Sequence, residues 1–454
     1  MTDEKKIFIA VLITSLMGPF MGSSINIAIP TMAAEFAVPA QELSWVVTAY
    51  LLGSVALLVP FGRLADIVGR RHLYAIGTIA VALMTFLAGL MQSVPSLVFF
   101  RLLQGLALAT IFSTGMAMLV ASHAPKERGR VIGYSAAATY IGLSLGPILG
   151  GLITQYLGWR LIFFLSAAAN IVSALVALRV KGEWYGERNG GMDYLGCVLY
   201  SAASTMILYG LSAYASHPVM RYVFFGGLLL LAAFVYEQLR AKAPLIDISL
   251  FRSTIFAMSN LAALLNYSAT FAISFLLSLY LQLIRGFDAS TAGLFMLLQP
   301  MMMALLSPLA GTLSDKHEPR LVASAGMAIT AIGIFGFSFL DTQMPMVLVG
   351  GIFLFIGTGF AFFSSPNSNA IMGAVEPRFY GVASSMLSVM RISGQAISMS
   401  VVTLLLAVYT ASTVAASASP AYLSDLLQAI QLIFRILAVT CVFGVAASLA
   451  RGNR

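Results

Sequence analysis

Three arginines lie inside long apolar stretches of this sequence: Arg391 and Arg435 deep within theirs, and Arg101 about four residues from the end of its stretch. If its stretch is a helix rising about 1.5 Å per residue, Arg391 lies roughly 16 Å from the start. An arginine inside a lipid bilayer costs about 2.5–3.5 kcal/mol on the mildest scale, so each must face a cavity or a polar partner. Arg101 could anchor helix packing through backbone carbonyls or Gln104, or it could face a polar pathway.

The acidic residues show the opposite distribution. The chain has 17 Asp and Glu residues, and none falls near the middle of an apolar stretch. A carboxylate in a low-dielectric interior is the usual switchable proton carrier, because burial raises its pKa toward neutrality. The sequence therefore lacks the obvious residue for coupling a process to protons.

Two patterns could suggest an enzyme or a metal site, and neither has the context it needs. Gly142-Leu-Ser-Leu-Gly146 matches a hydrolase nucleophile elbow, but that motif requires a strand–turn–helix and a His–acid pair. The four histidines are scattered over helix ends and loops, and the two cysteines lie in apolar stretches. We expect no catalytic residues, no cofactor and no metal.

Composition indicates the class of protein. Hydrophobic residues make up 59% of the chain and charged residues only 9%, whereas soluble domains carry about 25% charged residues. We count fourteen apolar runs long enough to cross a bilayer, and these must be helices because lipid offers no hydrogen-bond partners. The prediction is an all-α polytopic membrane protein. The expected spans are 7–30, 44–62, 72–92, 97–121, 131–155, 160–179, 193–214, 219–237, 254–284, 290–313, 320–340, 344–366, 380–410 and 425–450.

The basic residues predict the orientation. With the N-terminus inside, the inner segments hold nineteen Lys and Arg residues and the outer segments only Arg160, Arg221 and Arg285. By the positive-inside rule, this bias predicts a multi-pass protein of the cell (inner) membrane with both termini in the cytoplasm. The net charge of +8 reflects these loops and does not indicate a nucleic-acid partner.

A charged link between the second and third runs, Gly62-Arg-Leu-Ala-Asp66-Ile-Val-Gly69-Arg70-Arg71, predicts a tight turn in water and a charge latch between helix ends. Gly311-Thr-Leu-Ser-Asp315-Lys316 echoes it after a later inward-running helix. This repeat predicts two six-helix bundles, residues 1–179 and 253–454, with an inserted helix pair and linkers at 180–252. The predicted latch residues are Gly62, Asp66, Gly69, Arg70, Arg71 and Asp315.

The fifth run carries a glycine stripe that suits a moving interface. Glycines four residues apart share one helix face and let another backbone approach, while the proline removes one backbone hydrogen bond and predicts a kink. We predict a gating role for Gly142, Gly146, Pro147, Gly150 and Gly151.

Several motifs together carry a family resemblance: the Gly62–Arg71 link, Arg101-x-x-Gln104-Gly105, the glycine–proline stripe, Asn26-Ile-Ala-Ile-Pro30, Trp45-Val-Val-Thr-Ala-Tyr50, Pro244-Leu-Ile-Asp247 and Leu250-Phe251-Arg252. With them the chain resembles the major facilitator superfamily, and within it the fourteen-helix drug:proton antiporter group. The resemblance covers nearly the whole chain. It implies a transporter, not an enzyme, in which two bundles rock about a central cavity.

The chain departs from that group at one position. Its members commonly carry an aspartate in the first helix, nine residues before the proline of the Asn-x-Ala-x-Pro motif, and this sequence has Met21 there. The departure puts proton coupling in doubt.

The resulting functional hypothesis is a secondary active, ion-coupled transporter that exports lipophilic or amphiphilic small molecules by alternating access, as in multidrug efflux and antibiotic resistance, although it lacks the usual acid in the first helix. Interior arginines without interior acids favour neutral, zwitterionic or anionic cargo. The alternatives are an uncoupled or differently coupled facilitator, an organic-anion or lipid transporter, and a non-transporting membrane sensor. The expected partners are the substrate, protons as the candidate coupling ion, and the lipid bilayer, with the protein a monomer. The candidate pathway or coupling residues are Asn26, Arg101, Gln104, Asn266, Gln299, Arg391 and Gln395.

Overall fold

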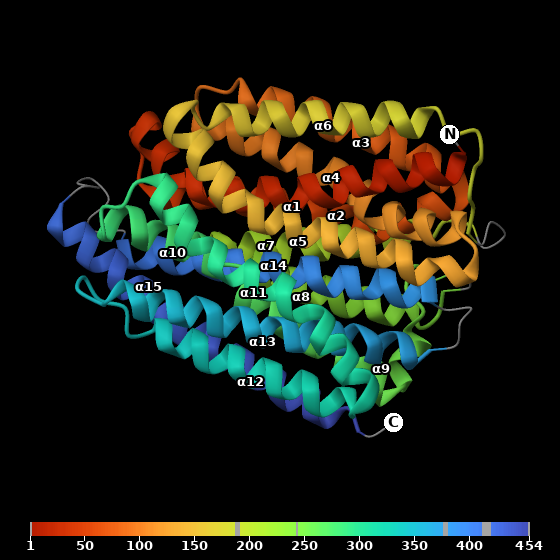
Figure 1. Cartoon of the computed structure of the whole chain (residues 1–454). Helices are drawn as coiled ribbons and strands as arrows, with labels where there is room; N and C mark the ends of the chain where they lie inside the picture. Colours follow the sequence, from red (N-terminus) through yellow and green to blue (C-terminus); the bar gives the residue numbers. More distant parts are fainter. Residues whose placement is uncertain (1, 187–190, 242–243, 376–379, 411–418, 453–454) are drawn as a thin grey trace. The chain divides into compact units, whose positions relative to one another are not determined.

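The computed structural model describes all residues except 1, 187–190, 242–243, 376–379, 411–418 and 453–454. The described chain is helical, with no strand (Figure 1). In chain order the helices are α1 (Asp3–Phe36), α2 (Ala40–Val68), α3 (Arg70–Gly89), α4 (Val94–Ser122), α5 (Pro125–Tyr156), α6 (Arg160–Leu178), α7 (Tyr194–Ser212), α8 (Pro218–Gln238), α9 (Thr254–Thr270), α10 (Ile273–Leu279), α11 (Ala289–Lys316), α12 (Pro319–Phe337), α13 (Met346–Gly373), α14 (Tyr380–Thr410) and α15 (Pro420–Ala450). Two short elements, η1 (Ile248–Arg252) and the π-helical turn η2 (Tyr280–Ile284), complete the series.

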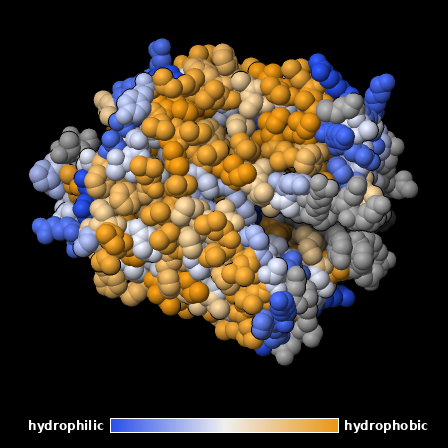
Figure 2. Space-filling view, in the orientation of Figure 1, coloured by the Kyte–Doolittle hydropathy of each residue, from blue (hydrophilic) through white to orange (hydrophobic). Residues whose placement is uncertain are grey.

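Fourteen of the described segments are long and apolar enough to cross a membrane, with α9, α10 and η2 forming one span. Many large apolar side chains on these helices are exposed, such as Leu229 at 74% and Val347 at 86%. Figure 2 shows apolar groups over the middle of the visible face and hydrophilic groups toward its two ends. This pattern fits helices whose outer surfaces meet lipid, and it confirms the predicted multi-pass membrane fold.

The helices divide into two compact units. The first comprises Met1–Gly22, Trp45–Leu143 and Gly158–Ile248. Within it α3 lies beside α4 and α6, and α7 pairs with α8 (Figure 1). The Ser201 hydroxyl of α7 donates to the Ala56 carbonyl of α2 at 2.8 Å, and Trp45 meets Tyr209 with ring centroids 5.7 Å apart. The inserted helix pair therefore packs on α2.

The second unit comprises Ser23–Ser44, Ser144–Leu157 and Ser249–Arg454. Within it α13 packs against both α11 and α12, α12 against α15, and α9 against α14 and α15. The later parts of α1 and α5, from residues 23 and 144 onward, thus belong to this unit. The predicted boundaries at 179/180 and 252/253 stay a prediction.

Glycines let neighbouring helices approach to backbone contact in both units. A Cβ on Gly105 of α4 would clash with the Tyr50 carbonyl of α2, and one on Gly53 of α2 would clash with the Leu102 carbonyl of α4. In the second unit a Cβ on Gly326 of α12 would lie 2.6 Å from the Gly359 carbonyl oxygen of α13. Helices in lipid associate through close packing of small residues rather than through a hydrophobic driving force, which explains these reciprocal notches.

The Gly62–Arg71 link differs from the expected turn. Helix α2 continues to Val68 and α3 begins at Arg70, so only Gly69 lies outside the helices. Gly69 has φ of 117°, a conformation that a side chain would strain. Gly62 lies inside α2, and the nearest atom to a Cβ there would be Ser113 Cβ at 3.9 Å, so this glycine is not needed for a tight turn.

We predict that Gly105→Val destabilises the protein, because its side chain would overlap the Tyr50 carbonyl and overpacking costs about 1–3 kcal/mol. Thermal unfolding of detergent-solubilised protein measures the effect. Gly351→Val is the control, since a Cβ there meets nothing within 4 Å. Equal melting temperatures for the two variants would contradict the assigned α2–α4 contact.

Candidate functional site

The Arg101 side chain of α4 is 2% exposed and is held by uncharged groups. Its Nε donates to the Val46 carbonyl at 2.9 Å, and its Nη1 donates to Gln104 Oε1 at 2.6 Å. Its guanidinium carbon lies 4.0 Å from the centre of the Tyr50 ring, in cation–π geometry. Among the described residues no carboxylate pairs with Arg101. A carbonyl, an amide and an aromatic face stabilise this buried cation.

Gln104 connects Arg101 to the position where an acid was expected. Its Nε2 donates to Thr85 Oγ1 at 2.6 Å and approaches Met21 Sδ at 3.3 Å. The Met21 side chain is 6% exposed. The thioether is a weak hydrogen-bond acceptor, so it occupies the site of the missing carboxylate without supplying its charge.

The acidic residues keep to the helix ends. In the described helices every Asp and Glu falls within the first or last two turns; Glu35 near the end of α1 and Asp425 near the start of α15 are examples. Moving a carboxylate out of water is costly without a partner, so ends that reach water are the favoured positions. The described structure thus places positive but not negative side chains in helix interiors.

The other predicted pathway residues lie in the second unit. Asn26 on α1 is 3% exposed and Asn266 on α9 is 0% exposed. In the described structure the Asn26 side-chain oxygen and both polar side-chain atoms of Asn266 lack a hydrogen-bond partner. An unsatisfied buried polar atom costs about 1–3 kcal/mol, so another conformation or a ligand could use these amides.

Gln299, Arg391 and Gln395 complete the predicted set. Gln299 lies on α11 and is 9% exposed. Arg391 and Gln395 are half-buried and four residues apart on α14, so they share one face of that helix. Among the seven predicted pathway residues, Arg101 and Gln104 are joined by a hydrogen bond.

A break in the ninth span was not expected from the sequence. Helix α9 ends at Thr270 and α10 begins at Ile273. The Ala272 N–H donates to Ser398 Oγ of α14 at 3.2 Å, and Ser398 lies one turn beyond Gln395. Interrupted helices often mark binding sites in transporters. No glycine or proline at residues 270–273 signals the break.

The glycine stripe of α5 makes close contacts in both units. In the first unit a Cβ on Gly142 would clash with the Leu16 carbonyl of α1. In the second, the Gly146 carbonyl accepts a hydrogen bond from Ser24 Oγ of α1 at 3.0 Å, and a Cβ on Gly150 would lie 2.6 Å from Ser24 Cβ. The predicted role of the stripe in close backbone approach therefore has a structural counterpart.

The far end of α5 crosses α11 in the same way. A Cβ on Gly151 would lie 2.5 Å from the Ala289 carbonyl oxygen, and a Cβ on Gly293 of α11 would clash with the Pro147 carbonyl. Helix α5 continues through Pro147, whose carbonyl is thus part of the contact. Sequence analysis did not single out Gly293, because the Pro147 carbonyl against which it packs lies on another helix.

Gln155 and Asp288 hydrogen-bond at the rim of this crossing. Ser290 N donates to Gln155 Oε1 at 3.2 Å, Gln155 Nε2 to Asp288 Oδ2 at 3.4 Å, and Thr291 N to Asp288 Oδ1 at 2.6 Å. Hydrogen bonds from Thr291 hold the pKa of Asp288 below its ordinary value of 3.8. Asp288 therefore stays ionised at neutral pH, and its bonds weaken only when pH falls through that lowered pKa.

The predicted latch residues form two ion pairs. Asp66 Oδ1 accepts from Arg70 Nε at 3.0 Å and from Arg70 Nη2 at 2.8 Å. Arg71 pairs with Glu183, a residue that sequence reasoning missed, at 3.1 Å. The side chain of Asp315 lies outside the described part of the chain.

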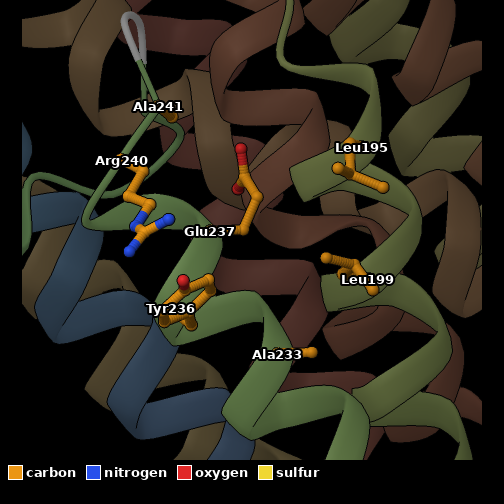
Figure 3. A pocket seen from close by; sticks show the side chains of 7 residues that line it. All are labelled: Leu195, Leu199, Ala233, Tyr236, Glu237, Arg240 and Ala241. Carbon is orange, nitrogen blue, oxygen red and sulfur yellow. The ribbon is translucent and has the colours of Figure 1, made fainter.

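A hollow of roughly 370 Å³ lies away from these residues, between the ends of α7 and α8 (Figure 3). Arg240 lies over the ring of Tyr236 there, with the guanidinium carbon 4.4 Å from the ring centre. None of the predicted pathway or latch residues lines this hollow. Its lining includes Leu195, Leu199, Ala233, Tyr236, Glu237 and Arg240.

Comparison with known proteins points to one family of similar proteins. The chain is 30% identical over 386 residues to the riboflavin transporter RibZ of Clostridioides difficile, covering 84% of each protein. It is 31% identical over 421 residues to the cephamycin export protein CmcT of Amycolatopsis lactamdurans, covering 89% of this chain and 84% of that protein. A third relative, the multidrug resistance protein Stp of Mycobacterium tuberculosis, is 30% identical over 397 residues, covering 86% and 73%.

Solved structures share the fold. The inward-facing, unoccupied bacterial homologue of the human lysosomal transporter Spinster superposes with a TM-score of 0.71 at 15% identity, covering 99% of this chain and 97% of that one. The family model described as Major Facilitator Superfamily matches residues 11–399 and 261–453. The chain therefore belongs to the major facilitator superfamily of membrane transporters and is not an enzyme.

Proposed function

We propose that this transporter exports lipophilic or amphiphilic small molecules across the cell (inner) membrane by alternating access. Both termini would lie in the cytoplasm, as the distribution of basic residues indicates. The drug and antibiotic exporters among the relatives support export. The riboflavin transporter among them supports a cargo range that extends to polar aromatic compounds. The protein would act as a monomer in the bilayer.

The single observation that carries the choice of cargo is the uncharged surroundings of Arg101. A permanent cation entering a pathway that presents a buried arginine and no carboxylate meets repulsion with no opposite charge to offset it. An anionic, zwitterionic or neutral molecule can accept hydrogen bonds from the guanidinium or from the unpartnered amide of Asn266. Neutral, zwitterionic and anionic amphiphiles are therefore the proposed substrates.

A second candidate is an uncoupled or differently coupled transporter of organic anions or lipids. The observation that favours it is Met21, whose sulfur lies 3.3 Å from Gln104 Nε2 where the related antiporters commonly carry an aspartate. Without a carboxylate there, proton exchange has no carrier in the interior of the first helix. Transport with and without a pH gradient separates this candidate from a proton antiporter.

We predict that proteoliposomes carrying the protein move anionic or neutral amphiphiles and not a quaternary ammonium compound of similar size. Arg101→Ala should lower the anion transport rate at least about tenfold, because truncating a buried hydrogen-bonded charge costs about 2–5 kcal/mol. Arg221→Ala, in the first turn of α8, is the matched control. Robust export of the quaternary cation that is independent of membrane potential would refute the proposed cargo class.

Met21→Asp tests the coupling argument. In the wild type, collapsing the pH gradient should leave the transport rate unchanged. The variant carboxylate would lie beside Gln104 and one hydrogen bond from Arg101, so it could pair with the guanidinium when ionised and release it when protonated. Its transport should then depend on the gradient, whereas Met21→Asn should not. Stoichiometric proton exchange by the wild type, measured with a pH-sensitive dye inside the vesicles, would overturn the argument.

The α5–α11 crossing is the proposed outer gate, and Gly293→Val should hold it open. The valine side chain cannot fit against the Pro147 carbonyl. A Ser24→Cys reporter, buried at 0% exposure beside Gly150, is placed in a Cys197→Ala, Cys441→Ala background. Labelling by a membrane-impermeant maleimide from outside should rise. The rise should be about tenfold for each 1.4 kcal/mol by which the substitution shifts the equilibrium toward the conformation with an open crossing.

Leu294→Ala, on the exposed side of α11, should leave labelling of the same reporter unchanged. Equal labelling of the Gly293→Val and Leu294→Ala proteins would show that the crossing does not gate access to Ser24.

A further inference from the structure

The segment Val180–Gly186, which leads from α6 toward the inserted helix pair, runs across the junction of α2 and α3. It follows Arg179, the C-cap of α6, and is described up to Gly186. The Gly186 N–H donates to the Asp66 carbonyl at 3.2 Å, and the Arg70 N–H donates to the Trp184 carbonyl at 2.8 Å. These two backbone hydrogen bonds flank Gly69. The linker therefore hydrogen-bonds to the α2–α3 junction on both sides of Gly69, the residue that separates the two helices.

Glu183 supplies the side-chain cap that the N-terminus of α3 lacks. The N-cap of α3 is Gly69, which makes no side-chain cap. The Arg71 N–H donates to Glu183 Oε1 at 2.7 Å, and Arg71 Nε donates to Glu183 Oε2 at 3.1 Å. A carboxylate at a helix N-terminus is favourable because it satisfies a free N–H and complements the helix dipole. One side chain thus caps the helix and neutralises the arginine that follows.

The contact is tightly fitted. A Cβ on Gly69 would lie 2.7 Å from the Glu183 carboxyl carbon, and a Cβ on Gly186 would clash with the Asp66 side chain. Arg71 Nη1 also donates to the Val180 carbonyl at 3.0 Å. The side chains of Arg71 and Glu183 are 20% and 17% exposed, so water screens their charges only in part.

The same segment is fastened to the start of α1. Asp3 Oδ2 accepts from the backbone N–H groups of Lys181 and Gly182 at 2.9 and 3.0 Å. Lys6 Nζ donates to the Arg179 carbonyl at 2.9 Å. Trp184 packs against a buried cluster that includes Ile7 and Tyr74. The linker is therefore held independently on α1 and on the α2–α3 junction.

We infer that Glu183 is a positioning residue for the transport cycle. Glu183 holds Arg71 and the first turn of α3 in place, so that of the two ion pairs described here only Asp66–Arg70 can exchange partners. This inference rests on the proposed alternating-access function. Two arginines follow Gly69, and the clamp formed by Val180–Gly186 occupies one of them. The other arginine, Arg70, is then the one whose ion pair can form and break during transport. In this conformation it pairs with Asp66 at 2.8 Å.

The test measures amide hydrogen exchange and transport on the full-length protein. Glu183→Ala should speed exchange in the first turn of α3 and lower the turnover number about tenfold, with KM unchanged because Glu183 does not touch substrate. Glu183→Gln keeps an acceptor oxygen for the Arg71 N–H but not the charge. Its exchange rate and turnover number should therefore fall between those of the wild type and of Glu183→Ala. Glu183→Ala/Arg71→Ala should be no slower than Glu183→Ala, because both substitutions remove the same contact.

Lys181→Ala is the matched control, since this residue contacts Asp3 through its backbone N–H and its side chain is exposed. Unchanged exchange in the Glu183→Ala protein would refute the clamp, and faster exchange with normal turnover would refute its role in the cycle. If the wild type moves none of the amphiphiles, the proposed function fails, and the exchange measurement still decides whether the clamp exists.

Discussion

Lipid cannot hydrogen-bond to a polypeptide, and the rest of this structure follows from that constraint. Every membrane-crossing segment must satisfy its own backbone, so the described chain is helical and its acids keep to the helix ends. Apolar burial gains little between helices already in lipid, and close backbone packing takes its place. The reciprocal notches of Gly53 with Gly105, and the approach of Gly326 to Gly359, hold helix pairs together in this way.

The same constraint makes Arg101 informative. A guanidinium in this environment must be paid for by hydrogen bonds, and here Val46, Gln104 and Tyr50 provide a carbonyl, an amide and a ring face. Because none of the three carries a negative charge, the site keeps its positive potential. That potential connects a packing detail to the choice of cargo. These contacts give Arg101 the anchoring role considered for it, and its role in the substrate pathway stays a prediction.

The polar ends of the helices form a second layer of organisation, built from contacts between distant parts of the chain. Glu183 caps α3 from 112 residues away in sequence. Gln155 of α5 bonds both Asp288 and Ser290 at the start of α11. In each case a carboxylate or amide satisfies the free N–H groups of a helix start while joining two elements. Helix starts are thus the points where charged and polar side chains join distant parts of the chain.

The sequence by itself determined the class, the helix count and the family, because apolar run length, the bias of basic residues and the spacing of Gly62–Arg71 and Arg101–Gln104 are local properties. It also located the glycine stripe of α5 and the absence of an interior acid. Only the tertiary structure decided the partners: Met21 beside Gln104, Gly293 against Pro147, Ser398 at the break after Thr270, and Glu183 on Arg71. These contacts depend on which helix faces meet, and helix periodicity does not specify that when nearly every face is apolar.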